Sequence, residues 1–411
     1  MGIIVIIIGL ALSIGLHEFG HLIPAKLFGV RVPHWAIGFG PKLFSKKIGE
    51  TEYSFRLIPL GGYITMIGMY PPDRKGKDAK RPFGRLIAQA RGAHSEFMQD
   101  GDEGKRTLYS LPAWKRIIIM FGGPVTNLII GMVLLTSVFV SVGSMQSTTS
   151  VKKVVPCVAA MTQGKCLADA LPTPAVAAGI LAGDKILTID GKSVSSYAQV
   201  QTAIQTSRAP IEMTLLRKGE TVSVTLPAAW AKLPYLDAKT GQQKTHTARF
   251  IGVSFAEKAV PTSFSEGFNQ AGSVVSGTFG IIGSFPQQVY TTLERTVLSQ
   301  ERDPNGAVSI VGVAEASTKV DSFAYWLYLL GSLNIALFVF NMIPLPPLDG
   351  GHIAGGVYEY LKRGAFKLLR KKDPGPVDTA LMAPIAQVMF VVLFFVGIMV
   401  VFADVVNPIV F

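Results

Sequence analysis

Charge and cysteine are both scarce in this sequence. Only 16% of the 411 residues are Asp, Glu, Lys or Arg, against roughly a quarter in an ordinary soluble domain, whereas 49% are hydrophobic. A purely water-soluble globular protein is therefore not expected. The two cysteines, Cys157 and Cys166, have no histidine and no second cysteine pair at ligand spacing, which argues against a cysteine metal site.

Full charges are absent from four long stretches, residues 1–16, 117–143, 322–348 and 379–403. A helix needs about 20 apolar residues to cross the hydrocarbon core of a bilayer. The first stretch is short, but its sequence stays compatible with a helix to Ile23. It lacks the positively charged start and the cleavage pattern of a signal peptide. We predict a polytopic α-helical membrane protein with four core transmembrane helices.

The excess of positive charge is spread unevenly. Residues 24–116 carry a net charge of +9, whereas residues 144–324 and 353–379 carry +3 each. Loops that are dense in Lys and Arg stay in the cytoplasm, so the first and third of these segments are predicted inside and the middle one outside. The net charge of +12 follows from this topology, and no nucleic-acid partner is expected.

Both cysteines fall in the segment that this topology places outside. An oxidising compartment favours pairing, so we expect a local disulfide between Cys157 and Cys166. Two buried free thiols are the alternative.

Three acidic residues lie within or beside the uncharged stretches: Glu18, Asp349 and Asp404. An ionisable group inside a membrane span is costly, so each one calls for a partner or a function. Asp404 lies one residue beyond the last stretch and is interpreted as a solvated helix end. Glu18 and Asp349 remain as candidates for a functional site.

Glu18 belongs to an H-E-x-x-H pattern formed with His17 and His21. Residues four apart on a helix share one face, so the two imidazoles can bind one Zn²⁺ while Glu18 acts on a water. The alternative is a pair of interface histidines with an ion-paired glutamate, but three polar groups would then lie in an apolar span without a function.

A catalytic zinc keeps three protein ligands and one open position, and Asp349 is the preferred third ligand. The first span reaches His17 after about 24 Å of helix, and the third span travels at least as far to Asp349, so both lie toward the cytoplasmic side. Prolines at 344, 346 and 347 predict irregular backbone at Asp349. His352 remains an alternative ligand.

Residues 16–21 (L-H-E-F-G-H) and 341–350 (N-M-I-P-L-P-P-L-D-G) together resemble the paired signatures of the site-2 intramembrane metalloproteases, in particular their RseP-like bacterial group. Matching pieces also occur at 38–41, 58–63 and 123–127. The resemblance implies a zinc cofactor, a catalytic acid/base, and a polar contact to substrate or to the developing oxyanion. The residues that it implies are His17, His21 and Asp349 as zinc ligands, Glu18 as the acid/base and Asn341 as the substrate contact.

Residues 52–57 alternate polar and apolar side chains, which is typical of a strand. The family resemblance implies a membrane-re-entrant β element here, whose edge strand would pair with an extended substrate. An ordinary cytoplasmic hairpin is equally consistent with the alternation. Asn127, in the matching piece at 123–127, is interpreted as a packing residue that hydrogen-bonds a neighbouring helix, outside the catalytic set.

Residues 151–258 contain strand-like runs and glycine turns, typical of a small β-rich domain with one or two helices. Within them, residues 174–184 resemble the A-G-x-x-x-G-D signature of a PDZ domain. We therefore predict four parts: an N-terminal catalytic membrane segment at 1–150, an extracytoplasmic PDZ-like domain at 151–258, an extracytoplasmic connector with amphipathic stretches at 259–321 and a C-terminal catalytic membrane segment at 322–411.

The resemblance implies an endopeptidase of the bacterial cytoplasmic membrane that cleaves single-span membrane proteins already trimmed by another protease, such as anti-sigma factors or remnant signal peptides. Two other functions compete. A zinc or other cation transporter would need further ligands along a path, but the second and fourth stretches have no His, Asp or Glu in their cores. A scaffold with a structural metal would need a closed four-ligand shell, whereas Glu18 flanks a three-ligand site.

Overall fold

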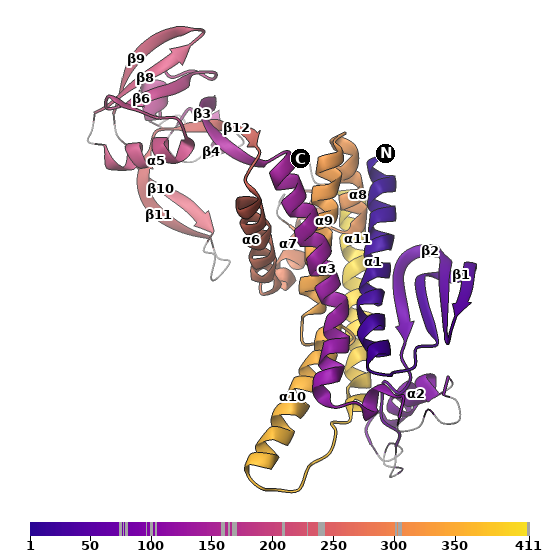
Figure 1. Ribbon diagram of the computed structural model, residues 1–411. Helices are drawn as coiled ribbons and strands as arrows, with labels where there is room; N and C mark the ends of the chain where they lie inside the picture. Colours follow the sequence, from indigo (N-terminus) through magenta and orange to yellow (C-terminus); the bar gives the residue numbers. More distant parts are fainter. Residues whose placement is uncertain are drawn as a thin grey trace. The chain divides into compact units, whose positions relative to one another are not determined.

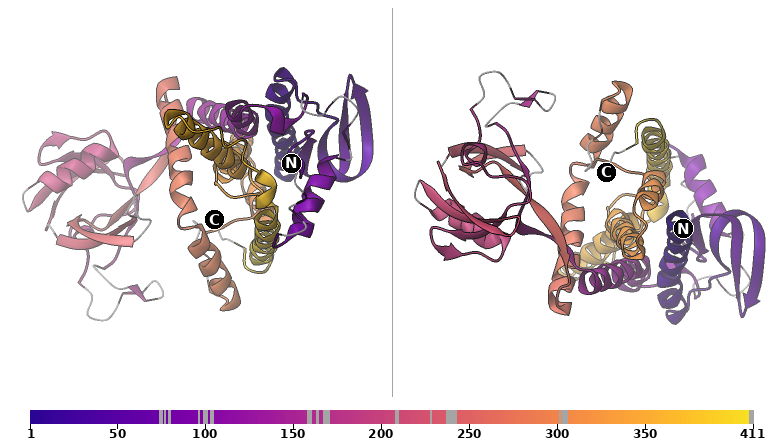
Figure 2. Two further views of the ribbon diagram at one scale, coloured as in Figure 1. Left: turned by 90° about the horizontal axis from the view of Figure 1, so that it is seen from below. Right: turned by 90° about the horizontal axis from the view of Figure 1, so that it is seen from above.

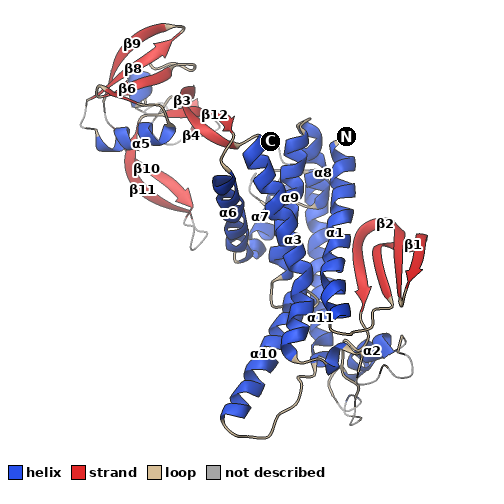
Figure 3. Cartoon of the chain, viewed as in Figure 1, coloured by secondary structure: helices blue, strands red, loops and turns tan. Residues whose placement is uncertain are grey.

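A computed structural model describes residues 1–408 except 74–75, 77, 79–80, 96, 99–101, 103–104, 158–160, 163–164, 167–170, 208–209, 228, 237–242, 301 and 303–305. The chain forms two compact units. The first contains Met1–Val138 and Ser265–Phe411, and the second contains Phe139–Phe264. The first unit is mostly helical with one β element, and the second is rich in strands (Figures 1 and 3).

Four helices of the first unit are long and apolar enough to cross a membrane. They are α1 (Gly2–Leu27), α3 (Ala113–Ser141), α9 (Phe323–Asn341) and α11 (Ala383–Val406), the last preceded by a 3-10 turn, η3 (Thr379–Met382). Each of the four predicted stretches thus contains a candidate membrane-spanning helix, with one difference at the end of the third. The helices run alongside one another (Figures 1 and 2).

Helices α1 and α3 pack with their backbones in close contact. A Cβ atom on Gly122 would overlap the carbonyl oxygen of Gly20, and a Cβ on Gly20 would overlap that of Gly122, so only glycine fits at either position. Small residues at such crossings are the usual solution between transmembrane helices, because lipid gives apolar side chains no reason to prefer another helix. The crossing sets the distance between the face of α1 that carries the histidines and α3.

Helix α9 packs along α1 in the same direction. Asn334 of α9 is fully buried and donates a hydrogen bond from Nδ2 to Ser13 Oγ of α1 at 2.9 Å. One turn earlier on each helix, Gly9 lies against Leu330. Because both helices advance together, residues beyond Ser13 and beyond Asn334 reach the same depth. This agrees with the estimate from helical rise, which predicted that His17 and Asp349 lie toward the same side of the membrane.

The third span ends earlier than the uncharged stretch. Helix α9 stops at Asn341, residues 342–348 form a non-helical loop, and a new helix, α10 (Asp349–Leu368), begins at Asp349. The prolines do break the helix, but the prediction of irregular backbone at Asp349 was wrong. Asp349 opens α10, where the exposed N–H groups of the first turn favour a carboxylate.

A β element formed by β1 (His34–Ile48) and β2 (Thr51–Thr65) packs beside α1. Residues 34–37 of β1 pair with two parts of β2, 52–55 on one side and 62–65 on the other. Trp35 anchors the element, since its ring meets Phe19 of α1 edge to face at 4.9 Å. Further along the strands, large apolar side chains are exposed: Phe39, Leu43, Phe44, Ile48, Leu57 and Ile58.

The remaining helices of the first unit are α2 (Gly84–Ser95), η2 (Leu108–Ser110), α6 (Phe264–Ile282), α7 (Phe285–Val297) and α8 (Ile310–Lys319). Helices α7 and α8 pack against α11. Asp404 of α11 pairs with Arg302 (Nη1 to Oδ1, 2.6 Å), and its Oδ2 accepts hydrogen bonds from the N–H groups of Ser309 and Gly312. The interpretation of Asp404 as a solvated helix end was wrong, because its side chain is almost completely buried.

The second unit is built on one antiparallel sheet in the order β12-β3-β6-β8-β9, with β7 paired to β6. Helix α5 covers it, and the core consists of aliphatic side chains such as Ile186, Leu215 and Val200. The strands of this sheet are β3 (Ser144–Val154), β6 (Lys185–Ile189), β7 (Lys192–Ser193), β8 (Ile211–Arg217), β9 (Glu220–Leu226) and β12 (Val253–Val260). The helices are α4 (Pro174–Ala177) and α5 (Tyr197–Thr206), and two further strand pairs are β4 (Met161–Thr162) with β5 (Lys165–Cys166) and β10 (Ala229–Leu236) with β11 (Gln243–Phe250).

Two sequence features of this unit have structural explanations. Cys157 is disulfide-bonded, which agrees with the predicted pairing of the two cysteines. In the segment 174–184, the buried Asp184 accepts two hydrogen bonds from Arg217 at 2.7 and 2.8 Å and one from the N–H of Leu181 at 2.9 Å. Arg217 holds the pKa of Asp184 below its usual range. The aspartate of the motif therefore fixes the turn that leads into β6.

We predict that Asp184→Asn lowers the stability of this sheet by about 1–2 kcal/mol, because the charged hydrogen bonds to Arg217 are weakened. Since the folded pKa of Asp184 is depressed, its contribution is complete above the usual aspartate pKa of about 3.9 and is lost as the pH falls through the folded value. Thermal unfolding of the full-length protein, followed at the β-sheet band of its circular dichroism spectrum, should show a difference from wild type at pH 7 that shrinks below about pH 4. Glu257→Gln, an exposed acid on β12, is the control; an equal effect of both variants would contradict the assignment.

Candidate metal centre

Three potential ligand side chains from distant parts of the chain meet between the helices. His17 and His21 project from α1, and Asp349 comes from the first turn of α10. The Nε2 atoms of the two histidines lie 3.3 Å apart, and Asp349 Oδ2 lies 3.3 Å from His17 Nε2 and 3.4 Å from His21 Nε2. The three atoms form a nearly equilateral triangle.

Hydrogen bonds on the far side of each imidazole fix which ring nitrogen faces the triangle. His21 Nδ1 donates to the carbonyl oxygen of Ile119 at 2.7 Å, and His17 Nδ1 donates to Asn127 Oδ1 at 3.1 Å. With the ring protons on Nδ1, both Nε2 atoms of the neutral rings present lone pairs to a carboxylate oxygen that is shielded from solvent. Three electron-pair donors facing one another repel unless a cation lies among them.

The distances between the three ligand atoms match those between the ligands of a tetrahedral zinc site. Zinc bonds histidine nitrogen and carboxylate oxygen at about 2.0–2.2 Å, so two ligands of a tetrahedron lie about 3.3–3.5 Å apart. The observed edges of 3.3 and 3.4 Å match this spacing. Two histidines and one carboxylate also leave a fourth position for water, as in catalytic sites. The residues present therefore fit a zinc ion.

Glu18 follows His17 on α1 and lies within electrostatic range of all three triangle residues without being one of them. The Glu18 side chain also lies close to β2, because a Cβ atom on Gly62 would lie 3.1 Å from Glu18 Cγ. The Glu18 side chain thus lies between the candidate metal centre and Gly62 of β2. This position suits a group that exchanges protons with a water or a substrate held there.

Helix α3 forms the side of the site that packs against the two imidazoles. A Cβ atom on Gly123 would overlap His21 Nε2 and approach His17 Cε1 to 2.8 Å, so glycine is required for the imidazoles to lie where they do. Asn127, one turn further along α3, is almost fully buried and holds His17. The prediction that Asn127 hydrogen-bonds a neighbouring helix is confirmed, but its partner, His17, was not identified from the sequence. The spacing of four residues from Gly123, which places both on one helix face, was the available signal.

The other two predicted residues lie nearby but outside the triangle. Asn341 is the last residue of α9 and is partly buried, directly before the loop that leads to Asp349. His352 lies on α10 beside Tyr70, with a ring distance of 6.5 Å, in a small pocket with Pro346 and Pro347. Within the described part of the chain, only His17, His21 and Asp349 form a group with metal-ligand spacing, so the alternative of His352 as third ligand is not supported.

Comparison with known proteins gives the class of this protein. The chain matches the model of Peptidase family M50 over residues 5–373 and therefore belongs to that family, which is the site-2 protease family. The expected family resemblance is confirmed at this level.

Curated relatives extend over nearly the whole chain. Zinc metalloprotease Rip1 of Mycobacterium tuberculosis is 28% identical over 425 residues, which covers 99% of this chain and 98% of the relative. Metalloprotease MmpA of Caulobacter vibrioides is 27% identical over 376 residues (85% and 84%), and a putative zinc metalloprotease of Clostridium perfringens is 27% identical over 357 residues (86% of each). The protein is thus a zinc metalloprotease with Zn²⁺ as its cofactor, and a cation transporter is not supported.

We predict that Asn127→Ala weakens zinc binding about 10- to 100-fold, because losing the partner of a metal-binding histidine frees its ring to turn. Zinc content would be measured by dialysing the purified protein against buffered zinc concentrations. Thr136→Val is a matched control, since Thr136 is buried on the same helix and its hydroxyl has no hydrogen-bond partner among the described residues. Unchanged zinc affinity in Asn127→Ala would show that His17 does not depend on this contact.

Proposed function

We propose that this zinc metalloprotease hydrolyses peptide bonds within or next to the transmembrane segments of single-span membrane proteins. The observation that carries the proposal is the triangle of His17, His21 and Asp349 between helices that are long and apolar enough to span a membrane. In this proposal the three residues hold the zinc and Glu18 is the catalytic acid/base. Asn341, at the end of α9, contacts the substrate backbone.

Each of these residues has a defined part in the reaction. The zinc, when bound, supplies Lewis-acid polarisation of the scissile carbonyl and a water of lowered pKa. Glu18 takes a proton from the attacking water and gives it to the leaving amine, because it is adjacent to the centre without being a ligand. Asn127 and the carbonyl of Ile119 hold the two imidazoles in the tautomer that leaves Nε2 free for the metal.

The β element is proposed to hold the substrate in an extended conformation. Among the described strands, residues 62–65 pair on one side only, with residues 34–37, and Gly62 lies against Glu18. An unwound substrate segment needs partners for its N–H and C=O groups because lipid offers none, and a free strand edge supplies them. The exposed apolar side chains along the rest of β1 and β2 are consistent with an element that enters the membrane.

We also propose a domain organisation and a membrane topology. Residues 151–258, which fall within the second unit, are proposed to form an extracytoplasmic PDZ domain that binds a peptide or part of the substrate. Residues 1–150 and 322–411 form the catalytic membrane segments, with 259–321 as their connector. We propose that the protein lies in the bacterial cytoplasmic membrane with the metal centre toward the cytoplasmic side, an orientation that the distribution of Lys and Arg supports. Anti-sigma factors and remnant signal peptides are the substrate classes proposed.

The first test separates proton transfer from metal binding. We expect Glu18→Gln to retain zinc while cleavage of a trimmed single-span reporter in detergent falls at least about 100-fold. Asp349→Ala should lose both zinc and cleavage, because it removes a ligand. Zinc content and reporter fragments are measured on the same preparations.

The outcomes of this test are distinct. Equal cleavage by wild type and Glu18→Gln would refute the role of Glu18, and full zinc retention in Asp349→Ala would refute its role as a ligand. Asp378→Asn, a partly exposed acid bound to Arg91 outside the site, is the control for a general effect of removing a carboxylate.

The second test concerns the unwinding of the substrate. A reporter with two helix-breaking residues beside the scissile bond should be cleaved several-fold faster than one with leucine at the same positions, because its backbone extends at lower cost. The comparison uses one enzyme preparation and quantifies initial rates by fragment mass. Equal rates for both reporters would argue against capture of the substrate as an added strand.

A further inference from the structure

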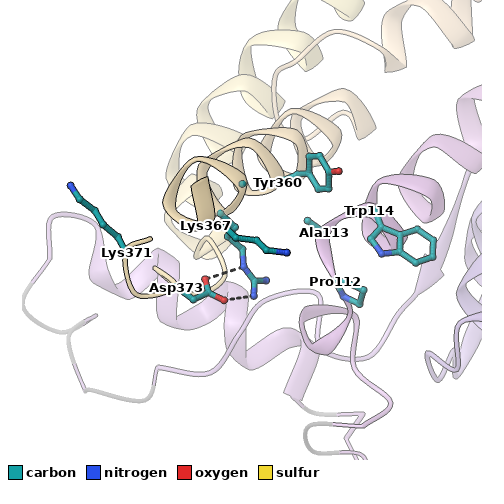
Figure 4. A pocket seen from close by; sticks show the side chains of 9 residues that line it. Pro112, Ala113, Trp114, Tyr360, Lys367, Lys371 and Asp373 are labelled. Atoms are coloured by element: carbon teal, nitrogen blue, oxygen red, sulfur yellow. Dashed lines mark hydrogen bonds and ion pairs between the residues drawn. The ribbon is translucent and has the colours of Figure 1, made fainter. Parts of the chain in front are cut away.

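A second pocket lies away from the metal centre, where the first residues of α3 meet the second half of α10 (Figure 4). Its volume is about 580 Å³. The wall on the α3 side includes Pro112 and Trp114, and the wall on the α10 side includes Tyr360, Arg363 and Lys367. Lys371 also lines the pocket, with its side chain pointing away from the others (Figure 4). Nothing in the proposed peptidase mechanism uses these residues.

The pocket carries a net positive charge. Its one acidic side chain, Asp373, is engaged by Arg363, with contacts of 3.1 Å from Nε and 2.5 Å from Nη2. Lys367 and Lys371 have no acidic partner in the described part of the chain. Three cations against one carboxylate leave a charge of +2 for an anion.

The walls are held in place by contacts outside the pocket. Arg116 of α3 pairs with Glu359 of α10 at 2.5 Å, and the buried Glu359 also accepts a hydrogen bond from the N–H of Val377 at 2.8 Å. One turn before Glu359, Gly356 lets α10 approach Ile117 closely. The two helices are therefore joined directly beside the pocket.

The setting of the pocket is that of a membrane interface. Trp114 is the second residue of a candidate membrane-spanning helix, and its ring is positioned by Phe28 and by the Lys115 ammonium. Trp114 and Tyr360 are both about half exposed, at 47% and 60%. Aromatic rings at the ends of spans lie at the level of the lipid headgroups. Along α10 and just beyond it, Leu361 and the pair Leu368 and Leu369 are exposed, as expected where acyl chains cover a helix.

We propose that this pocket binds the phosphate headgroup of an anionic phospholipid. Arg363 and Lys367 contact the phosphate, and Lys371 adds positive charge at the edge of the pocket. The exposed leucines contact the acyl chains. A free phosphate offers the same charge but nothing for the aromatic and apolar surroundings to bind. The proposal rests on the membrane location given under the proposed function. It does not depend on peptidase activity, because the pocket begins about 16 Å along α10 from Asp349.

The fluorescence of Trp114 reports on lipid at this site. The full-length protein is reconstituted in phosphatidylcholine bilayers with increasing amounts of phosphatidylglycerol carrying brominated acyl chains, which quench a neighbouring indole. The chain has four tryptophans, so each preparation is paired with its Trp114→Phe counterpart and the difference gives the Trp114 signal. We expect phosphatidylglycerol to be preferred over phosphatidylcholine at least about fivefold.

Two double variants separate the pocket from general surface charge. Lys367→Gln/Lys371→Gln should abolish the preference, and Lys367→Arg/Lys371→Arg should keep it, which excludes misfolding as the cause of the loss. Lys362→Gln/Lys372→Gln removes the same charge from residues that do not line the pocket and should keep the preference.

Three results would overturn the proposal. Wild type could show no preference, both glutamine variants could lose it equally, or millimolar inorganic phosphate could erase it, which would assign the pocket to a soluble anion. Reporter cleavage is measured separately in detergent, so loss of peptidase activity and loss of lipid preference are distinguishable.

Discussion

The structure depends on holding three electron-pair donors together inside an apolar helix bundle. Two imidazole nitrogens and one carboxylate oxygen lie within 3.4 Å of one another, although each repels the others unless a cation is present. Three helices contribute to this arrangement. Helix α1 supplies both histidines, α3 fixes their tautomers, and α10 brings the carboxylate. A cation held by these three side chains would therefore join α1 to α10, two helices that are far apart in the sequence.

Placing donors so tightly demands that backbones approach more closely than ordinary side chains allow. The crossing of α1 and α3 is closed by Gly20 and Gly122, and Gly123 leaves room for the imidazoles. The helix breaks after Asn341, and residues 342–348 lead into a second helix, α10. Because a new helix starts at Asp349, its carboxylate is held by regular backbone rather than by a loop.

Other buried charges in the first unit are structural. Arg302 and Asp404 tie the segment before α8 to the end of α11, and Arg116 and Glu359 join α3 to α10. Both pairs are largely buried and accompanied by hydrogen bonds from backbone groups, which is the condition under which such pairs persist. The second pair also fixes the helix that carries Asp349. A lipid headgroup bound beside it would contact the same two helices at the level of the membrane surface.

The sequence alone predicted a membrane protein with four candidate spans and singled out the three side chains of the candidate metal centre. Hydropathy, the four-residue spacing of His17 and His21, and the cost of a buried acid are local properties of the chain. Only the tertiary structure decided which groups orient them. The contact of Asn127 with His17, the burial of Asp404 against Arg302 and the helical start at Asp349 each depend on a partner far away in the sequence. No local pattern encodes such a partner, since a lone polar residue in an apolar helix is equally compatible with a packing contact, a solvated end or a functional role.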